Sequence, residues 1–230
     1  MLIAGADGCR EGWLCLEDLD GHVRGRVFGS FANMLNGVQG ASHVTIDIPI
    51  GLPLSRERDC DVAARRLLRA PRSSSVFPAP VYGVVQEDDY QRACEVHRQI
   101  DGRALSRQAF AILPKIREVN GLMWSDPAHQ QRVREVHPEV CFAVWNRDKA
   151  MQYRKAIVSG RLERQVLIDE VWPGQWRIVR DELSGHSFEI DDLNDAFAAL
   201  WTAKRIASGD ARTIGSGQLD PGGLRMEMWA

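Results

Sequence analysis

The 230-residue sequence has few cysteines, no long apolar run and no excess of positive charge, and each absence excludes a class of protein. The five cysteines are scattered without a Cys-x-x-Cys pair, and the six histidines lack ligand spacing, which disfavours a disulfide framework or a zinc site. No stretch approaches the roughly 18 apolar residues of a membrane span, and the few before Asp7 are too short for a secretory signal. We therefore expect a soluble, cytoplasmic protein.

Charge is nearly balanced, with 29 Lys and Arg against 31 Asp and Glu and a formal net charge of -2. This balance argues against a broadly basic surface that coats nucleic acid nonspecifically, but it leaves room for a local basic groove. The length suits a single domain spanning 1–230 with a substantial core. No pattern reports the oligomeric state, so a homo-oligomer stays open.

Short apolar or alternating runs at both ends of the chain predict an α/β fold. The first three strands are expected at 2–7, 12–17 and 22–28, with Asp20-Gly21 as a hairpin turn. Apolar residues then recur at helical spacing from Phe31 to Val38, and a β-branched strand follows at 44–48. The predicted order is therefore strand, strand, strand, helix, strand.

Arg-rich helical patterns occupy the middle of the chain, from about 51 to 130. A loop at 70–80 with three prolines and three serines interrupts them, and we interpret the region as an inserted, mostly helical cap. The core resumes with a strand at 133–137 and a helix from about Cys141. Further on, apolar residues from Leu193 to Ala207 predict a C-terminal helix with Asp191 as its N-cap, and 222–229 add a short extended segment.

Two aspartates stand where a strand would ordinarily place apolar side chains. Asp7 ends the first strand, and Asp47 lies within the β-branched run at 44–48. A carboxylate in such a run is costly to bury unless it is hydrogen-bonded, paired or bound to a cation. The alternative is a turn-forming aspartate at a strand end, although its occurrence on two strands of one core is harder to attribute to chance.

Three further acids fit the same interpretation. Glu139 follows the strand at 133–137, and Asp192 and Asp195 begin the last helix. The helix macrodipole explains Asp192 but explains Asp195 less well, because the effect decays within the first turn. Carboxylates without thiolate or imidazole partners suit Mg2+ or Mn2+, and two such ions about 3.5 to 4 Å apart can promote phosphodiester cleavage.

Basic and hydroxyl side chains of the middle region are candidates for binding a phosphate-containing substrate. They are Arg58, Arg65, Arg66, Arg72, Ser74, Ser75, Lys115 and Arg117. An equally good interpretation is a solvated helix face on which arginines pair with neighbouring acids, and a flexible serine loop.

Six motifs together give the chain a family resemblance. They are Gly5-Ala6-Asp7-Gly8-Cys9-Arg10-Glu11-Gly12-Trp13, Thr45-Ile46-Asp47-Ile48-Pro49-Ile50-Gly51-Leu52-Pro53, Arg58-Asp59-Cys60-Asp61, Ser74-Ser75-Val76-Phe77-Pro78-Ala79-Pro80, His137-Pro138-Glu139-Val140-Cys141-Phe142, and Asp191-Asp192 with Asp195-Ala196. In this order, nearly end to end, the sequence resembles the bacterial and archaeal family known as domain of unknown function 429.

The resemblance implies a ribonuclease H-like fold, a mixed five-stranded sheet with its second strand antiparallel and helices on both sides. It also implies a nuclease, a function that for this family is itself inferred from fold and acids. Asp7 matches the central metal-bridging aspartate and Asp195 the acid on the final helix, while Asp47 and Glu139 fill the intermediate positions. Asn120 departs from the family pattern, which has an aspartate there.

Three function classes follow from these observations. The first is a metal-dependent nuclease acting on DNA or RNA, with Asp7, Asp47, Glu139 and Asp195 as catalytic residues and Asp192 as an added ligand. The second is a nucleotide- or phosphate-binding protein of the same fold resembling a phosphotransferase, although Gly-rich phosphate loops are not evident beyond Gly5 and Gly8. The third is a non-catalytic nucleic-acid-binding module.

Overall fold

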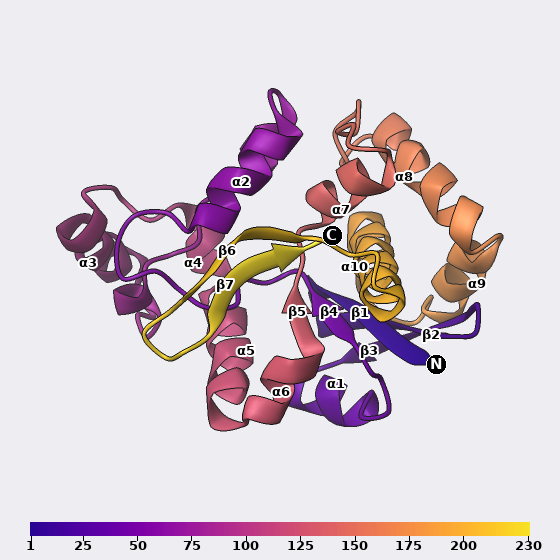
Figure 1. Ribbon diagram of the computed structural model, residues 1–230, viewed down its shortest axis with the longest axis horizontal. Helices are drawn as coiled ribbons and strands as arrows, with labels where there is room; N and C mark the ends of the chain where they lie inside the picture. Colours follow the sequence, from indigo (N-terminus) through magenta and orange to yellow (C-terminus); the bar gives the residue numbers. More distant parts are fainter. The chain divides into compact units, whose positions relative to one another are not determined.

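A computed structural model describes all 230 residues and confirms an α/β protein built around a mixed five-stranded sheet with helices on its faces (Figure 1). The sheet has the order β3-β2-β1-β4-β5. Its strands are β1 (Leu2–Cys9), β2 (Gly12–Leu19), β3 (His22–Phe28), β4 (Val44–Ile46) and β5 (Val133–Glu135). The first three pair antiparallel, whereas β4 pairs parallel to β1 and β5 parallel to β4.

The predicted hairpin turn is present between β2 and β3. Asp20 and Gly21 both have positive φ, 54° and 92°, which is the backbone that a tight two-residue hairpin requires and that Asp-Gly adopts readily. Chain elements far apart in sequence complete the unit, since Arg132 to Arg212 and the last two residues join Met1 to Asp47 in one compact body. A second body contains Ile48–Gln131 and Thr213–Met228.

One face of the sheet is covered by the long helix α10 (Ile190–Ser208). Gly5 makes the contact close, because a Cβ at this position would lie 2.0 Å from the backbone nitrogen of Leu200. The Thr45 hydroxyl, opposite Gly5 on β4, donates to the Ala199 carbonyl at 2.7 Å. Backbone-to-backbone packing of this kind fixes the distance between the helix and the strands. It therefore also fixes the position of any side chain that the helix extends over the end of the sheet.

The opposite face is covered by α1 (Phe31–Gly37), whose buried residues are Phe31, Met34 and Leu35. Ser30 caps this helix by accepting from the backbone nitrogen of Asn33 at 3.2 Å. Phe31 packs on Trp13 of β2 with ring centroids 5.3 Å apart. Because successive side chains of a strand point to opposite faces of the sheet, the strands contribute to two cores, one on each side.

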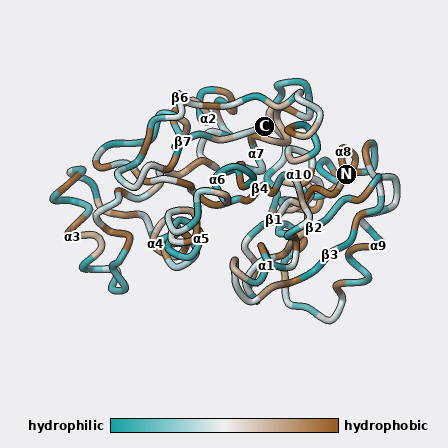
Figure 2. Tube along the Cα trace, turned by 60° about the horizontal axis from the view of Figure 1, so that its bottom comes forward, coloured by the Kyte–Doolittle hydropathy of each residue, from teal (hydrophilic) through white to brown (hydrophobic).

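Three more helices complete the first unit: α7 (Pro138–Trp145), α8 (Val158–Val171) and α9 (Gln175–Glu182). Trp172, at the end of α8, is buried and donates from its indole nitrogen to Asp18 at 2.8 Å. Val179 and Leu183 meet Gly25 on β3, where a side chain would leave no space for α9. Hydrophobic and hydrophilic residues alternate along α9 (Figure 2), as expected of a helix with one buried face, whereas six of the eight residues of α7 are buried.

The second unit is mainly helical. Its elements are α2 (Asp59–Leu68), the 3-10 turns η1 (Arg72–Ser75) and η2 (Tyr82–Val84), α3 (Tyr90–Asp101), α4 (Arg107–Ala111), α5 (Leu113–Ser125), α6 (Pro127–Arg132, ending at the boundary) and the hairpin β6 (Thr213–Leu219) and β7 (Arg225–Trp229). Gly215 of β6 lies against Cys60 of α2, and the Ser216 nitrogen donates to Asp59 at 2.8 Å. The hairpin thus packs on α2.

The sequence analysis erred at several boundaries. Helix α7 begins at Pro138 rather than about Cys141, because proline is suited to the first helical position. The N-cap of α10 is Glu189 rather than Asp191, since Glu189 and Asp192 form a reciprocal capping box. Helices α8 and α9 and strand β6 were not anticipated. No helix is long and apolar enough to cross a lipid bilayer.

Candidate metal centre

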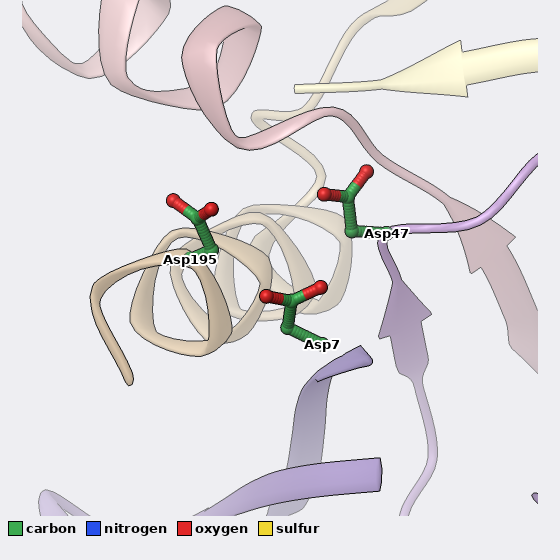
Figure 3. A group of neighbouring side chains, drawn as sticks. All are labelled: Asp7, Asp47 and Asp195. Carbon is green, nitrogen blue, oxygen red and sulfur yellow. The ribbon is translucent and has the colours of Figure 1, made fainter. Parts of the chain in front are cut away.

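Three aspartates from three separate elements meet at one end of the first unit (Figure 3). Asp7 lies on β1, Asp47 directly follows β4, and Asp195 is in the second turn of α10. Because β1 and β4 are parallel neighbours, their carboxyl ends reach the same sheet edge. One carboxylate oxygen from each residue lies within 4.8 Å of the other two. Three of the four acids that the sequence analysis expected to share a site therefore lie together.

Local structure explains why each side chain points into the cluster. The Asp47 nitrogen donates to the Ala6 carbonyl at 3.2 Å, which extends the pairing of β4 with β1 by one residue. On α10, Asp195 shares a stripe with Ala199 and Thr202, and Ala199 lies against the sheet through its hydrogen bond with Thr45. The packing of the stripe directs Asp195 over the ends of the strands.

The cluster is largely removed from water. Asp7 is 8% exposed and Asp195 1% exposed, while Asp47 is partly buried. Asp7 accepts one hydrogen bond, from the backbone nitrogen of Gly8 at 2.7 Å, whereas Asp195 Oδ1 is buried without any donor. Burying an acceptor in this way is costly unless another partner, such as a cation, is supplied.

Burial and mutual repulsion shift the acids toward their protonated forms. Burial, followed by the charges of Asp47 and Asp195, holds the pKa of Asp7 well above its usual range. The same two causes, burial and then Asp195, raise the pKa of Asp47 to about 7, and burial likewise raises that of Asp195. Three acids that disfavour one another's charge are arranged as a site for positive charge.

Lys155 supplies one positive charge to the cluster. Its ammonium donates to Asp195 Oδ2, although its side chain is 45% exposed. Burial by itself lowers the pKa of this ammonium, but the carboxylates of Asp195, Asp7 and Asp47 outweigh it and hold the pKa above its ordinary value. The lysine lies between α7 and α8, in a segment to which the sequence analysis gave no role.

Glu139 is near the triad but is not one of its three members. It is 5% exposed, and its Oε1 accepts from Arg164, which is completely buried on α8. Its Oε2 is buried without a hydrogen-bond partner. The Glu139 charge raises the pKa of both Asp47 and Asp195, so its field reaches the cluster.

Asp192 has a structural role at the start of α10. Its Oδ2 accepts from the Glu189 backbone nitrogen at 2.9 Å, which completes the capping box. Burial raises its pKa, and the Asp195 charge adds to the effect. The residue therefore feels the cluster while its carboxylate serves the helix N-terminus.

The predicted substrate-binding residues all belong to the second unit, whereas the acidic cluster belongs to the first. Arg58 is 2% exposed and pairs with Asp61, so its guanidinium is part of the core and does not face solvent. Arg65 pairs with Glu57 and Arg117 with Asp88. Arg66 and Ser74 are exposed, while Arg72, Ser75 and Lys115 are partly buried.

Asn120 stands where the family resemblance led us to expect an aspartate. Asn120 is fully buried on α5, and its side-chain oxygen accepts from the Gly51 nitrogen at 3.4 Å. The amide oxygen accepts this hydrogen bond without bringing a buried charge, but the Asn120 Nδ2 group is buried without a partner.

A family model described as "Protein of unknown function (DUF429)" matches residues 5–218. The chain belongs to this family. The match includes Asp7, Asp47, Glu139, Lys155 and Asp195, so the whole cluster lies in the DUF429 region. No curated protein and no solved structure matches the chain.

Sequence reasoning on this DUF429 chain found the acids but missed Lys155 and Arg164. Arg164 had no clear signal, because the apolar residues Val158, Leu162 and Val166 of α8 are exposed, and its buried side carries Gly160 and Arg164 beside Ile168. Lys155 had none, because Tyr153-Arg154-Lys155 reads as an ordinary polar connection. Only the folding of that connection against α8 brings its ammonium to Asp195.

Proposed function

We propose that this protein is a metal-dependent nuclease of ribonuclease H-like fold that hydrolyses phosphodiester bonds. The observation that carries the proposal is the convergence of Asp7, Asp47 and Asp195, with carboxylate oxygens within 4.8 Å of one another. The strand order β3-β2-β1-β4-β5, with β2 antiparallel and the last acid on a helix packed over β1, supports the fold assignment.

The donor set fits a hard divalent cation. Carboxylate oxygens alone, without thiolate or imidazole, suit Mg2+ or Mn2+. The buried Asp195 Oδ1 lacks a donor, and a cation would supply the missing partner. Asp7, Asp47 and Asp195 would hold the ion, and the unpartnered Glu139 Oε2 would join Asp47 at a second one. When bound, such ions stabilise charge on the attacking and leaving oxygens of a phosphodiester.

The chain's own residues then have defined tasks. Asp7, on a central strand, and Asp195, on the helix locked above it, orient the ion between rigid elements rather than loops. Arg164 fixes the Glu139 carboxylate through its guanidinium. Exposed basic side chains of the second unit, Arg66 among them, are the candidates for contacting the backbone of DNA or RNA.

The geometry of the β1–β2 turn disfavours a phosphotransferase that binds ATP there. Cys9 pairs directly with Gly12, so only Arg10 and Glu11 form the turn, too few residues to surround a triphosphate with backbone nitrogens. The Glu11 carboxylate lies at this turn and accepts from His186 at 2.9 Å and from the Ser187 nitrogen at 2.7 Å. A carboxylate in that place repels phosphate.

A cleavage assay with a matched control tests the proposal. Purified protein is incubated with Mn2+ and labelled single-stranded and duplex DNA and RNA, alongside Asp7→Asn and Asp20→Asn. Asp20 is an exposed turn residue, so its substitution removes the same charge away from the cluster. Because metal-assisted charge stabilisation supplies several kcal/mol, we expect Asp7→Asn to lower cleavage by about 10³-fold and Asp20→Asn to leave it unchanged.

Diffraction from Mn2+-soaked crystals adds a readout that needs no substrate. Anomalous density between Asp7, Asp47 and Asp195 is expected. Cleavage that survives Asp7→Asn, or Mn2+ sites that avoid all three aspartates, would contradict the proposal.

A further inference from the structure

Lys155 stands out among the cations of the first unit, because its charged end contacts the candidate metal centre while its stem remains accessible. The ammonium donates to Asp195 Oδ2, and Asp195 is 1% exposed against 45% for the lysine side chain. The same charge lowers the pKa of Asp7, Asp47 and Asp192, so it acts on the whole cluster and not only on its contact partner.

The segment that carries Lys155 is held in place by α8. The Glu163 carboxylate accepts from the backbone nitrogens of Gln152 at 2.7 Å and Tyr153 at 3.0 Å. Arg164 donates to the Tyr153 carbonyl at 3.3 Å. Gly160 permits the closest approach, because a Cβ there would lie 1.9 Å from the Arg154 carbonyl oxygen. Position 155 is therefore anchored on its N-terminal side, and only the flexible lysine stem is free to move.

Helix α8 thus links two charges to the acids. Through Arg164 it fixes Glu139, and through the 152–154 segment it presents Lys155 to Asp195. The Arg164 guanidinium is fully buried, whereas the Lys155 ammonium is at the end of a half-exposed side chain. Arg164 is therefore a fixed part of the core, whereas the Lys155 ammonium can move away from Asp195.

We propose that Lys155 is a built-in counter-ion that competes with the divalent cation for Asp195, so that its displacement sets the metal concentration at which the centre fills. The inference rests on the proposed metal-dependent function. An ion held by the free Oδ1 of Asp195 would lie next to the ammonium on Oδ2 of the same carboxylate, and repulsion between the two positive charges favours departure of the flexible lysine. The apparent metal affinity is then lower than the intrinsic affinity, because only the molecules in which Lys155 has left Asp195 can bind the ion.

Isothermal titration calorimetry with Mn2+ tests whether Lys155 and the metal ion compete for Asp195. Wild type, Lys155→Met and the control Lys149→Met are compared at one pH and ionic strength. Lys149 is an exposed lysine in the same connection, so its substitution removes an equal charge away from the triad. We expect Lys155→Met to bind Mn2+ about tenfold more tightly and Lys149→Met to match wild type. Equal or weaker binding by Lys155→Met would overturn the inference.

A second measurement separates displacement from simple repulsion. Acetylation of wild-type lysines by an N-hydroxysuccinimide ester, followed by mass spectrometry, should increase at Lys155 on adding Mn2+ while Lys149 stays constant. Unchanged labelling of Lys155 would contradict displacement. Because this assay uses the wild-type chain, it does not depend on whether Lys155→Met folds, and Lys155→Gln provides a second titration variant.

The outcomes distinguish the inference from the proposed function. Mn2+ binding by wild type with no gain in either Lys155 variant rejects the counter-ion and leaves the metal centre standing. Binding only by the Lys155 variants supports the counter-ion strongly. No binding by any of these proteins rejects both.

Discussion

The two units each contain a buried arginine–carboxylate pair, and the pairs differ in whether their hydrogen bonds are complete. In the second unit, Asp61 accepts from Arg58 through both oxygens and also from the Ala79 nitrogen, while Arg58 further donates to the Ile50 and Gly51 carbonyls. In the first, Glu139 Oε2 and Arg164 Nε are buried without partners.

This difference separates a structural pair from a pair near a site. A complete pair contributes to a fixed fold, whereas an incomplete one carries a desolvation cost that persists only where the surrounding structure or a ligand compensates it. Glu139 adds to the charge that the aspartate triad experiences, and Asp61 does not. Three buried atoms without partners, Glu139 Oε2, Arg164 Nε and Asp195 Oδ1, therefore belong to the region where we place the metal centre, although Asp59 Oδ1 and Asn120 Nδ2 of the second unit lack partners as well.

The largest expected effect comes from breaking the complete pair. Asp61→Asn leaves the Arg58 guanidinium buried without its counter-charge, which should lower the free energy of unfolding by about 3–5 kcal/mol. Urea denaturation followed by circular dichroism measures the loss. Mn2+ affinity of the folded fraction should stay at the wild-type value, and a parallel loss of Mn2+ binding would show that the two pairs are not independent.

The next largest effect concerns the contact that sets the height of α10. Gly5→Ala places a methyl group 2.0 Å from the Leu200 nitrogen, so the helix must shift, at a cost of about 2 kcal/mol. Mn2+ affinity should fall as well, because Asp195 moves with the helix. Gly121→Ala is the control, since a Cβ there meets nothing within 4 Å. Wild-type Mn2+ binding in Gly5→Ala would refute the role assigned to close packing.

A smaller effect is expected from the incomplete pair. Glu139→Gln keeps an oxygen for Arg164 and relieves repulsion within the cluster, which offsets most of the cost of leaving Arg164 without a counter-charge, so the free energy of unfolding should fall by only about 1 kcal/mol. Because the Glu139 charge raises the pKa of Asp47 and Asp195, the substitution should shift the pH midpoint of Mn2+ binding to lower pH. Titrations at a series of pH values measure the shift. A loss of stability as large as that of Asp61→Asn would remove the contrast.

The last prediction concerns the pH dependence of stability in EDTA. Burial and Asp195 raise the pKa of Asp47 to about 7, above the value of about 3.9 in an unfolded chain. The folded state therefore binds this proton more tightly, so the contribution of Asp47 to stability is greatest below about pH 4 and is lost as the pH rises through about 7. Urea midpoints across this range should fall with pH, and Asp47→Asn should reduce the slope. An unchanged slope would assign the dependence to other groups.

The sequence by itself determined most of the sheet, its two covering helices and the identity of the acids. Alternation placed β1 to β3, the Asp-Gly turn set the register of β2 against β3, and the apolar stripe of α10 identified that helix. These signals are local and repeat every two or every three to four residues. Carboxylates inside apolar strands were visible for the same reason, since their cost of burial is a property of the residue type and its neighbours.

The tertiary structure alone decided which charges meet. Helix α8 carries an arginine on its buried side, and five of the seven residues of the hairpin strand β6 are polar or glycine, so neither has a clear local period. Lys155 and Arg164 reach Asp195 and Glu139 only through contacts 40 and 25 residues apart in the chain. Pairing over such separations depends on how the elements pack, and no local pattern of residues encodes it.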